Sequence, residues 1–293
     1  ELDVALLAYY YPLLNLKELT HKLLEYESDS ILFNDLILVQ IKEPLKENDL
    51  LKDIPTFGEI YDHTSQEVRK QYEKYPYPRW RYCKINVPLS ISDAIHTGIS
   101  PNKVHFSFPD NPEILIAGCG TGLHVFRTNY INSNILAVDL SHRSLAYSKR
   151  KSIEAGLDNV QYLHSDILQL CNLGKSFDII EASGVLHHMK NPSDGLTVLL
   201  SLLKDSGYLK LGLYSEYARS DIVEARRLIE ESNIPSDDDE IRNCRESLMI
   251  EHSKGLFNEL FRIRDFYSLS MCKDLLFHVQ EHRFTLPQIS ELL

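Results

Sequence analysis

The chain has 293 residues, of which 43% are hydrophobic, and a formal net charge of −11 at pH 7. This length and composition are typical of a globular protein with one large domain, or a core domain with a smaller partner. The negative charge argues against wide contact with nucleic acid, because phosphate binding needs clustered Lys and Arg. The five cysteines include no C-x-x-C pair, which is typical of a protein in a reducing compartment without structural zinc.

The sequence carries no sign of a membrane segment or a leader. No apolar run approaches the ~18 residues that span a bilayer, and no signal peptide is recognisable. We therefore predict a cytoplasmic protein that does not contact membranes. The chain starts at Glu1, without a methionine and within a helical pattern, so we expect it to be an excerpt of a longer chain.

Two segments precede the predicted core. Residues 1–60 carry Leu and Ile at helical spacing and are predicted to form an all-helical accessory segment. Residues 61–108 are predicted to connect it to the core, starting with a helix that Thr64 and Glu67 would cap. That helix should end at the block Tyr75–Trp80, where two prolines impose an extended backbone. The block is either a rigid linker or a lid over a ligand, in which Arg79 would pair with a carboxylate.

A glycine-rich turn follows the first predicted strand. Ile114–Ala117 is predicted to be a buried strand, and Gly118, Gly120 and Gly122 come directly after it. We expect this turn to leave main-chain N–H groups uncovered, so that a ligand can lie against the backbone. A dinucleotide site would need a glycine at the sixth position, where this chain has Leu123.

A second predicted strand ends at an acid. Ile135–Val138 is apolar, and Asp139 stands at its carboxyl end. If this strand lies parallel to the first, the carboxylate comes beside the glycine turn, where it can accept both hydroxyls of a ribose.

The Gly-x-Gly-x-Gly turn with Asp139 resembles motif I of the class I S-adenosylmethionine-dependent methyltransferases. The resemblance implies an α/β fold, with a Rossmann-like sheet covered by helices on both faces, and S-adenosylmethionine as cofactor. It places the methyltransferase domain at residues 109–293. The family's sheet ends in an antiparallel hairpin, which this sequence lacks after its last predicted helix, so we expect the domain to be truncated.

Several stretches resemble a bacterial subfamily of these enzymes: Gln71–Glu73 with Tyr75–Trp80, and later Arg264–Ser268 with Asp274–Leu286. In that subfamily the methyltransferase domain often follows tetratricopeptide repeats. The chain contains no 34-residue repeat, so such a partner region would lie upstream of Glu1.

The resemblance also implies further cofactor contacts. Asp166 and Ile167 follow the third predicted strand, where the family places an acid for the adenine amino group and an apolar neighbour for the ring. Asp166 as the N-cap of the next helix is the alternative. The expected cofactor-binding residues are Gly118, Cys119, Gly120, Gly122, Asp139, Leu140, Asp166, Ile167 and Gly184.

The candidates for proton transfer follow the fourth and fifth predicted strands. His187 and His188 come after Phe177–Glu181, and an imidazole titrates near neutral pH. A purely structural role for the two histidines is the alternative, and Tyr214, after Gly207–Leu213, is a further candidate. The residues expected on the acceptor side are Tyr75, Tyr77, Arg79, Trp80 and His282.

His278 and His282 are predicted to lie one turn apart on a helix within residues 247–284. This spacing suits a two-histidine zinc site, but no third ligand is evident, so we predict no metal and a helix that faces substrate or a partner.

The sequence thus predicts in-line methyl transfer from S-adenosylmethionine to an unidentified small molecule or protein side chain. The competing hypothesis is a non-catalytic module on the same fold that binds S-adenosylmethionine or a partner. The oligomeric state does not follow from the sequence.

Overall fold

The computed structural model describes residues 1–83, 89–91, 93, 108–128, 130 and 132–293. Much of the predicted connecting segment 61–108 therefore lies outside the described residues. The chain divides into two compact units, Glu1–Ile54 and Pro55–Leu293. Residues 55–60 belong to the second unit. Among the described residues, no helix combines the length and the apolar character that crossing a membrane requires.

The first unit is helical, as predicted. It contains α1 (Leu2–Tyr10), α2 (Lys17–Glu25), α3 (Ile31–Ile37) and α4 (Glu43–Leu50), with a π-helical turn at Leu38–Lys42. Its core consists of Leu13, Leu23, Phe33, Ile37 and Ile41. α2 and α3 each bury residues in this core, whereas α1 and α4 contribute only partly buried residues to it.

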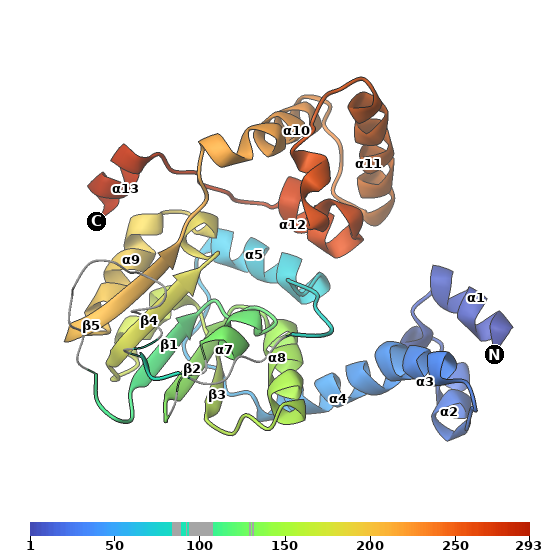
Figure 1. Cartoon of the computed structure of the whole chain (residues 1–293), viewed down its shortest axis with the longest axis horizontal. Coiled ribbons are helices and arrows are strands. Elements are labelled where there is room, and N and C mark those ends of the chain that lie inside the picture. The colour runs from blue at the N-terminus through green and yellow to red at the C-terminus, as the bar shows by residue number, and fades with distance from the viewer. Residues whose placement is uncertain (84–88, 92, 94–107, 129, 131) are drawn as a thin grey trace. The chain divides into compact units, whose positions relative to one another are not determined.

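The second unit is built on a parallel sheet of five strands (Figure 1). The strands are β1 (Glu113–Ala117), β2 (Asn134–Asp139), β3 (Val160–His164), β4 (Phe177–Ser183) and β5 (Leu203–Gly212). They lie in the order β3-β2-β1-β4-β5, and every neighbouring pair is parallel. The order reverses at β1, and ligands bind at such a switch point in open α/β sheets.

Both faces of the strands β1, β2 and β4 are buried, which explains their near-continuous apolar sequences, whereas β5 has no buried residue. Leu115 and Ala117 of β1 face a core that includes Leu196 and Leu199 of α9 (Pro192–Ser201). Ile114 and Ile116 point to the other face, and are 0% and 2% exposed. On the sheet's flank, α8 (His142–Glu154) contacts β2 and β3. The predicted Rossmann-like α/β fold with helices on both faces is confirmed.

The helix before the block Tyr75–Trp80 starts differently from the prediction. Helix α5 spans His63–Lys74, and its N-cap is Asp62, whose carboxylate accepts the N–H of Ser65 at 2.8 Å. The predicted capping by Thr64 and Glu67 is therefore wrong, because the acid one residue before the helix takes that role.

Three helices after the sheet form a core of their own: α10 (Ser220–Glu231), α11 (Asp238–Ser253) and α12 (Leu269–Phe277). The prediction that His278 and His282 lie on a helix is wrong, because α12 ends at Phe277 and an extended segment follows (Figure 1). The main chain of that segment pairs with the residues that follow β5. Phe284 N–H donates to the Tyr214 carbonyl at 2.9 Å, and Glu216 N–H donates to the Phe284 carbonyl at 3.2 Å. The last helix, α13 (Leu286–Leu292), begins with a capping box of Thr285 and Gln288.

Candidate cofactor and acceptor site

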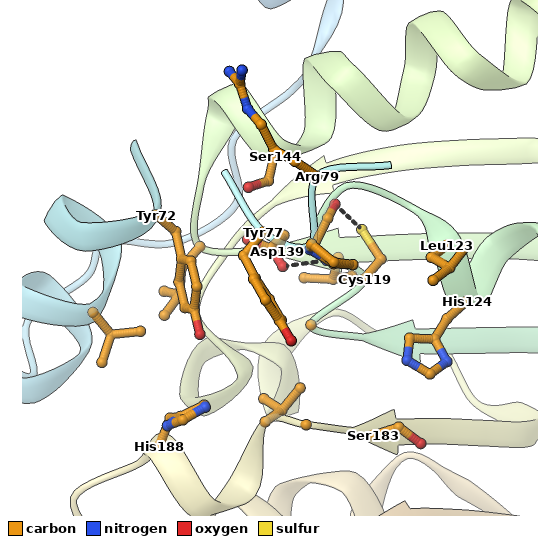
Figure 2. A pocket seen from close by; sticks show the side chains of 18 of the residues that line it. Tyr72, Tyr77, Arg79, Cys119, Leu123, His124, Asp139, Ser144, Ser183 and His188 are labelled. Atoms are coloured by element: carbon orange, nitrogen blue, oxygen red, sulfur yellow. Dashed lines mark hydrogen bonds between the residues drawn. The ribbon is translucent and has the colours of Figure 1, made fainter. Parts of the chain in front are cut away.

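A cavity of about 700 Å³ lies where the parallel strands end. Residues at or just after the carboxyl ends of all five strands line it: Gly118, Asp139, Ser165, Ser183 and Tyr214. Figure 2 shows part of the lining, with Asp139 and Cys119 near the first turn and His188 on the opposite side. The volume is in the range of small-molecule and cofactor sites.

The glycine turn does not expose free N–H groups, so that part of the sequence prediction is wrong. The N–H groups of Gly118 and Cys119 both donate to the Val138 carbonyl, at 2.8 and 2.9 Å. The N–H of Gly120 donates to the Asp139 carboxylate at 2.7 Å, and that of Thr121 to the Tyr77 carbonyl at 3.2 Å. The chain therefore satisfies these donors itself.

Close packing explains two of the glycines. Gly118 has a φ of +71°, and a Cβ there would come within 2.2 Å of Val185. Gly120 has a φ of +53°, and a Cβ there would come within 2.6 Å of the Tyr77 carbonyl oxygen. Both positions need a positive φ and tolerate no side chain, which only glycine combines at low cost.

The Tyr-Pro block lies against this turn. Thr121 donates its hydroxyl to the Pro78 carbonyl, and Trp80 Nε1 donates to the Thr121 carbonyl at 3.2 Å. The Tyr77 hydroxyl donates to Asp265 at 2.8 Å, and burial raises the pKa of this tyrosine. Tyr77, Arg79 and Trp80 all line the cavity, so the block covers one side of it.

Two residues of the block differ from the expectation in part. Tyr75 does not line the cavity, because its hydroxyl bonds to Asp238 instead. Arg79 lines the cavity, but its side chain is exposed and extends away from Tyr77 and His188 (Figure 2).

Asp139 is held by the main chain beside the turn. One carboxylate oxygen accepts the N–H of Gly120 at 2.7 Å, and the other accepts that of Ser141 at 2.8 Å. Burial raises the pKa of this carboxyl to about 6, although the two N–H bonds by themselves lower the pKa. Each oxygen keeps further acceptor capacity and the residue lines the cavity, so the arrangement fits a ribose diol.

Asp166 serves as a helix cap and as a wall of the cavity. Its carboxylate accepts the N–H of Leu168 at 3.0 Å, at the start of the 3-10 helix Ile167–Asn172. The capping alternative is thus observed, and Asp166 and Ile167 both line the cavity. The other expected cofactor residues Cys119, Leu140 and Gly184 line it too, whereas Gly122 packs against Ser148.

His187 and His188 have different surroundings. His187 is fully buried, stacks on Tyr214 with ring centroids 3.7 Å apart, and does not line the cavity. Neither of its ring nitrogens has a hydrogen-bond partner among the described residues, and burial lowers its pKa to about 2. These surroundings fit the structural alternative for His187 better than the proposed role in proton transfer.

His188 and Tyr214 both line the cavity. His188 Nδ1 lies 2.7 Å from the Gln280 carbonyl oxygen, and burial lowers the pKa of this histidine to about 4. Tyr214 is sandwiched between His187 and the Arg219 guanidinium, whose carbon lies 3.8 Å from the ring centroid. Burial raises the pKa of Tyr214, so its hydroxyl stays protonated near neutral pH.

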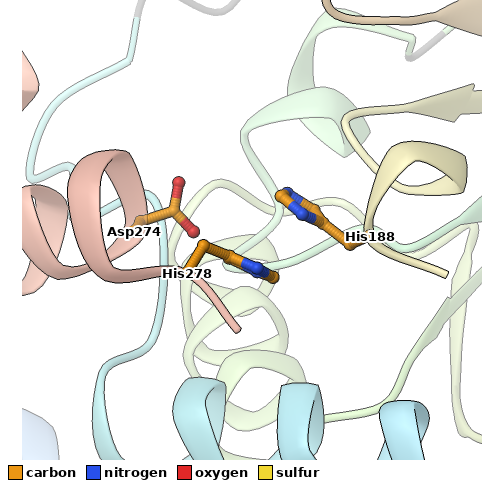
Figure 3. A group of neighbouring side chains, drawn as sticks. All are labelled: His188, Asp274 and His278. Atoms are coloured by element: carbon orange, nitrogen blue, oxygen red, sulfur yellow. The ribbon is translucent and has the colours of Figure 1, made fainter. Parts of the chain in front are cut away.

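A buried cluster joins His188 to α12 (Figure 3). One potential ligand atom from each of His188, Asp274 and His278 lies within 4.8 Å of the others. However, the Tyr72 hydroxyl lies between Asp274 Oδ1, at 2.7 Å, and His278 Nε2, at 3.1 Å. The two imidazoles also stack at 3.6 Å with an interplanar angle of 18°, so their in-plane lone pairs do not converge on one ion. The cluster fits a hydrogen-bonded array better than a metal site.

His282 does not line the cavity. Its Nε2 lies 3.0 Å from the Met189 carbonyl oxygen, and its N–H donates to the His187 carbonyl at 2.7 Å. Because the backbone is extended after Phe277, His278 and His282 are not one helical turn apart, and the expected acceptor contact of His282 is not observed.

Three residues near the cavity had no role predicted from the sequence: Tyr72 and Asp265, which line it, and Asp274, which bonds to Tyr72. All three lie in or beside the sequence blocks that carry the subfamily resemblance, which was the available signal.

Residues 115–211 match the family model described as a methyltransferase domain. An uncharacterised protein of Synechococcus is 29% identical over 190 residues, covering 59% of this chain and 42% of that protein. A tRNA U34 carboxymethyltransferase of Psychromonas ingrahamii is 31% identical over 121 residues, covering 41% of this chain and 34% of the relative. The chain thus spans less than half the length of these curated relatives.

Among solved structures, PKMT2 from Rickettsia typhi in complex with AdoHcy superimposes with a TM-score of 0.53. The sequence identity is 20%, and the match covers 64% of this chain and 39% of that one. This similarity shows a shared fold.

Proposed function

We propose that this protein is an S-adenosylmethionine-dependent methyltransferase whose cofactor and acceptor meet in the cavity at the ends of the strands. The observation that carries the proposal is the composition of that cavity. One half of the cavity contains Asp139 and Asp166, which follow β2 and β3 and suit a nucleoside. The other half contains His188 and Tyr214, and the two halves form one continuous cavity. The match of residues 115–211 to a methyltransferase domain supports this assignment.

The geometry supports a specific set of residues for S-adenosylmethionine. The Asp139 carboxylate is fixed from both oxygens by main-chain N–H groups and would accept the ribose hydroxyls. Asp166 and the apolar side chain of Ile167 would take the adenine. The Tyr77–Trp80 segment, bonded to Thr121, would cover the cofactor and exclude water.

S-adenosylmethionine supplies a methyl group that is already activated by the sulfonium. The protein therefore has to hold the attacking atom in line with the methyl carbon and keep water out. His188 and Tyr214 stand on the acceptor side, where a neutral imidazole and a protonated phenol can orient an incoming polar group.

We propose a small molecule as the acceptor, in preference to a protein side chain. The hydrogen bonds that join Tyr77, Pro78 and Trp80 to Thr121 support this choice, because they hold the lid segment against the turn. The tetratricopeptide-repeat partner region upstream stays a prediction.

Two measurements test the proposal. Calorimetric titration should give heat with S-adenosylmethionine and none with NAD, whereas heat with NAD alone would contradict it. Incubation of a cell lysate of the source organism with the protein and methyl-labelled S-adenosylmethionine should then label a species that mass spectrometry can identify. Binding without label transfer would support the non-catalytic alternative.

A further inference from the structure

The main chain of Gln280 bonds to two histidines, to one through its carbonyl oxygen and to the other through its N–H. Its carbonyl oxygen lies 2.7 Å from His188 Nδ1, and its N–H donates to His278 Nδ1 at 3.1 Å. A carbonyl oxygen only accepts and a backbone N–H only donates. His188 must therefore be protonated at Nδ1, and His278 must be unprotonated there.

These two bonds fix opposite tautomers in the neutral rings. A neutral imidazole carries one proton, so His278 carries it on Nε2 and donates to the Tyr72 hydroxyl oxygen at 3.1 Å. Tyr72 in turn donates to Asp274 Oδ1 at 2.7 Å. His278, Tyr72 and Asp274 thus form a consistent chain of donors and acceptors.

In His188 the tautomer leaves Nε2 with a lone pair. Among the described residues this nitrogen has no hydrogen-bond partner, and His188 lines the cavity whereas His278 does not. The His188 ring cannot easily turn, because it stacks on the His278 ring and also packs edge-on against the His187 ring, with the ring centroids of His187 and His188 4.3 Å apart. The fold thus presents one fixed acceptor nitrogen to the acceptor half of the cavity.

We infer that His188 Nε2 accepts the hydrogen bond, and then the proton, of a hydroxyl group that is methylated in the cavity, and that the Gln280 main chain positions it. This inference rests on the proposed function. In the step, the hydroxyl oxygen forms a bond to the methyl carbon while the carbon–sulfur bond breaks and its electron pair stays on sulfur. The hydroxyl proton passes to Nε2, which gives a methyl ether, a neutral thioether and an imidazolium.

The surroundings of His188 favour a hydroxyl over an ammonium acceptor. Burial holds the pKa of His188 at about 4, far below the pKa of about 10 of an alkylammonium such as lysine. Such a weak base cannot take a proton from an ammonium, and a neutral amine needs no base. A hydroxyl oxygen becomes strongly acidic as its new bond to carbon forms, so even a weak base can take its proton.

The charged and titratable groups around His188 come from several elements. His187 is its neighbour in the chain, and Tyr214 and Arg219 follow β5. Tyr72 comes from α5, Arg226 from α10 and Asp274 from α12, and His278 and His282 lie in the segment after α12. The cations Arg219 and Arg226 disfavour an imidazolium, whereas the Asp274 carboxylate favours it when ionised.

Two substitutions separate proton acceptance from a packing role. His188→Asn keeps an amide that can donate to the Gln280 carbonyl but has no atom at the Nε2 position. His188→Gln places an amide near Nε2 that cannot take a proton. Each variant is assayed with methyl-labelled S-adenosylmethionine and the same cell lysate as the unmodified protein, with cofactor affinity measured by calorimetry and folding by thermal unfolding.

We expect the labelled product to be a methyl ether and both variants to transfer label about 100-fold more slowly or worse, with cofactor affinity changed by less than about 3-fold. Added imidazole should restore part of the rate to His188→Ala. A labelled methylamine, or a His188→Asn rate equal to that of the unmodified protein, would overturn the inference and leave the proposed function standing. An unmodified protein that transfers no label would overturn both.

The positioning role has its own spectroscopic test. In protein labelled with nitrogen-15 histidine, long-range proton–nitrogen correlations distinguish protonated from unprotonated ring nitrogens. At pH 7 we expect His188 to be protonated at Nδ1 and His278 at Nε2, with signals assigned by their loss in His188→Asn and His278→Asn. A His188 protonated at Nε2 would contradict the inference even if the enzyme is active.

Discussion

Gly120 lies directly against the carbonyl oxygen of Tyr77, so that a Cβ atom at Gly120 would approach this oxygen to 2.6 Å. The Tyr77–Trp80 segment thus constrains the residue type at this position of the glycine turn. The contact is to backbone, which cannot rotate out of the way as a flexible side chain could.

Gly120→Ala should therefore displace the Tyr77–Trp80 segment. We expect S-adenosylmethionine to bind about 10-fold more weakly or worse, because the displaced segment would lose its contacts with the cofactor. The matched control is Gly174→Ala. Gly174 has a similar φ of +67° with nothing within 4 Å of its Cβ position, so it reports backbone strain alone. Calorimetry of both variants checks this, and equal cofactor affinities would show that the Tyr77 contact does not matter for binding.

Asp139→Ala should weaken S-adenosylmethionine binding by about 10- to 100-fold or more, because hydrogen bonds to a charged acceptor contribute about 1.5–3 kcal/mol each. The ionised carboxylate is the better acceptor, and burial raises its pKa to about 6. The affinity of the unmodified protein should therefore fall as the pH drops through about 6, and calorimetry at pH 8 and pH 5 measures the change.

Asp178→Ala provides the control for Asp139. Asp178 also accepts a main-chain N–H, that of Glu113 at 2.9 Å, but it does not line the cavity. Its loss should lower stability and leave cofactor affinity unchanged. If Asp139→Ala bound the cofactor as tightly as Asp178→Ala, the ribose role of Asp139 would be refuted.

The local pattern predicted the sheet and half of the site. Buried strands, the glycine turn and Asp139 are recognisable because short apolar runs and glycine spacing report local backbone requirements. The capping error at α5 has the same origin, since Asp62 and Thr64 are both good caps and only the structure selects between them.

The other half of the site was not predictable in this way. His188 meets Gln280 from 92 positions away, and Tyr72 meets Asp274 from 202. The contact to Gln280 runs through its backbone, so the identity of its side chain carries no signal. The segment after α12 pairs with residues 214–216 and bonds to the His187 carbonyl, and such contacts between distant parts of the chain leave no local sequence pattern.

His187→Phe should stabilise the protein in mild acid. Burial depresses the pKa of folded His187 to about 2, from about 6.5 when unfolded, so acid favours the unfolded state that binds the proton. At pH 5 this costs about 2 kcal/mol, and above about pH 7 it costs nothing. Phe keeps a ring against Tyr214 and removes two buried nitrogens without partners among the described residues.

Urea unfolding at pH 5 and pH 8 measures this difference. The free energy of unfolding should fall less between pH 8 and pH 5 in His187→Phe than in the unmodified protein. His21→Phe, at a side chain that is 78% exposed, is the control substitution, because it replaces a histidine at the surface and not in the buried site. The same pH dependence in His187→Phe and the unmodified protein would contradict the interpretation.

Glu281→Gln should destabilise the segment that carries Gln280. The Glu281 side chain is 1% exposed, and it pairs with Arg219 at 2.8 Å and with Arg226 at 3.4 Å. A neutral amide would leave these two cations, whose side chains are each 13% exposed, without their buried anion, and breaking such a buried pair typically costs about 3–5 kcal/mol. Arg283 also pairs with Glu216, whose side chain is 42% exposed, so Glu216→Gln should cost about 1 kcal/mol or less. Free energies of unfolding in urea compare the two variants, and an equal loss would show that Glu281 does not anchor this segment.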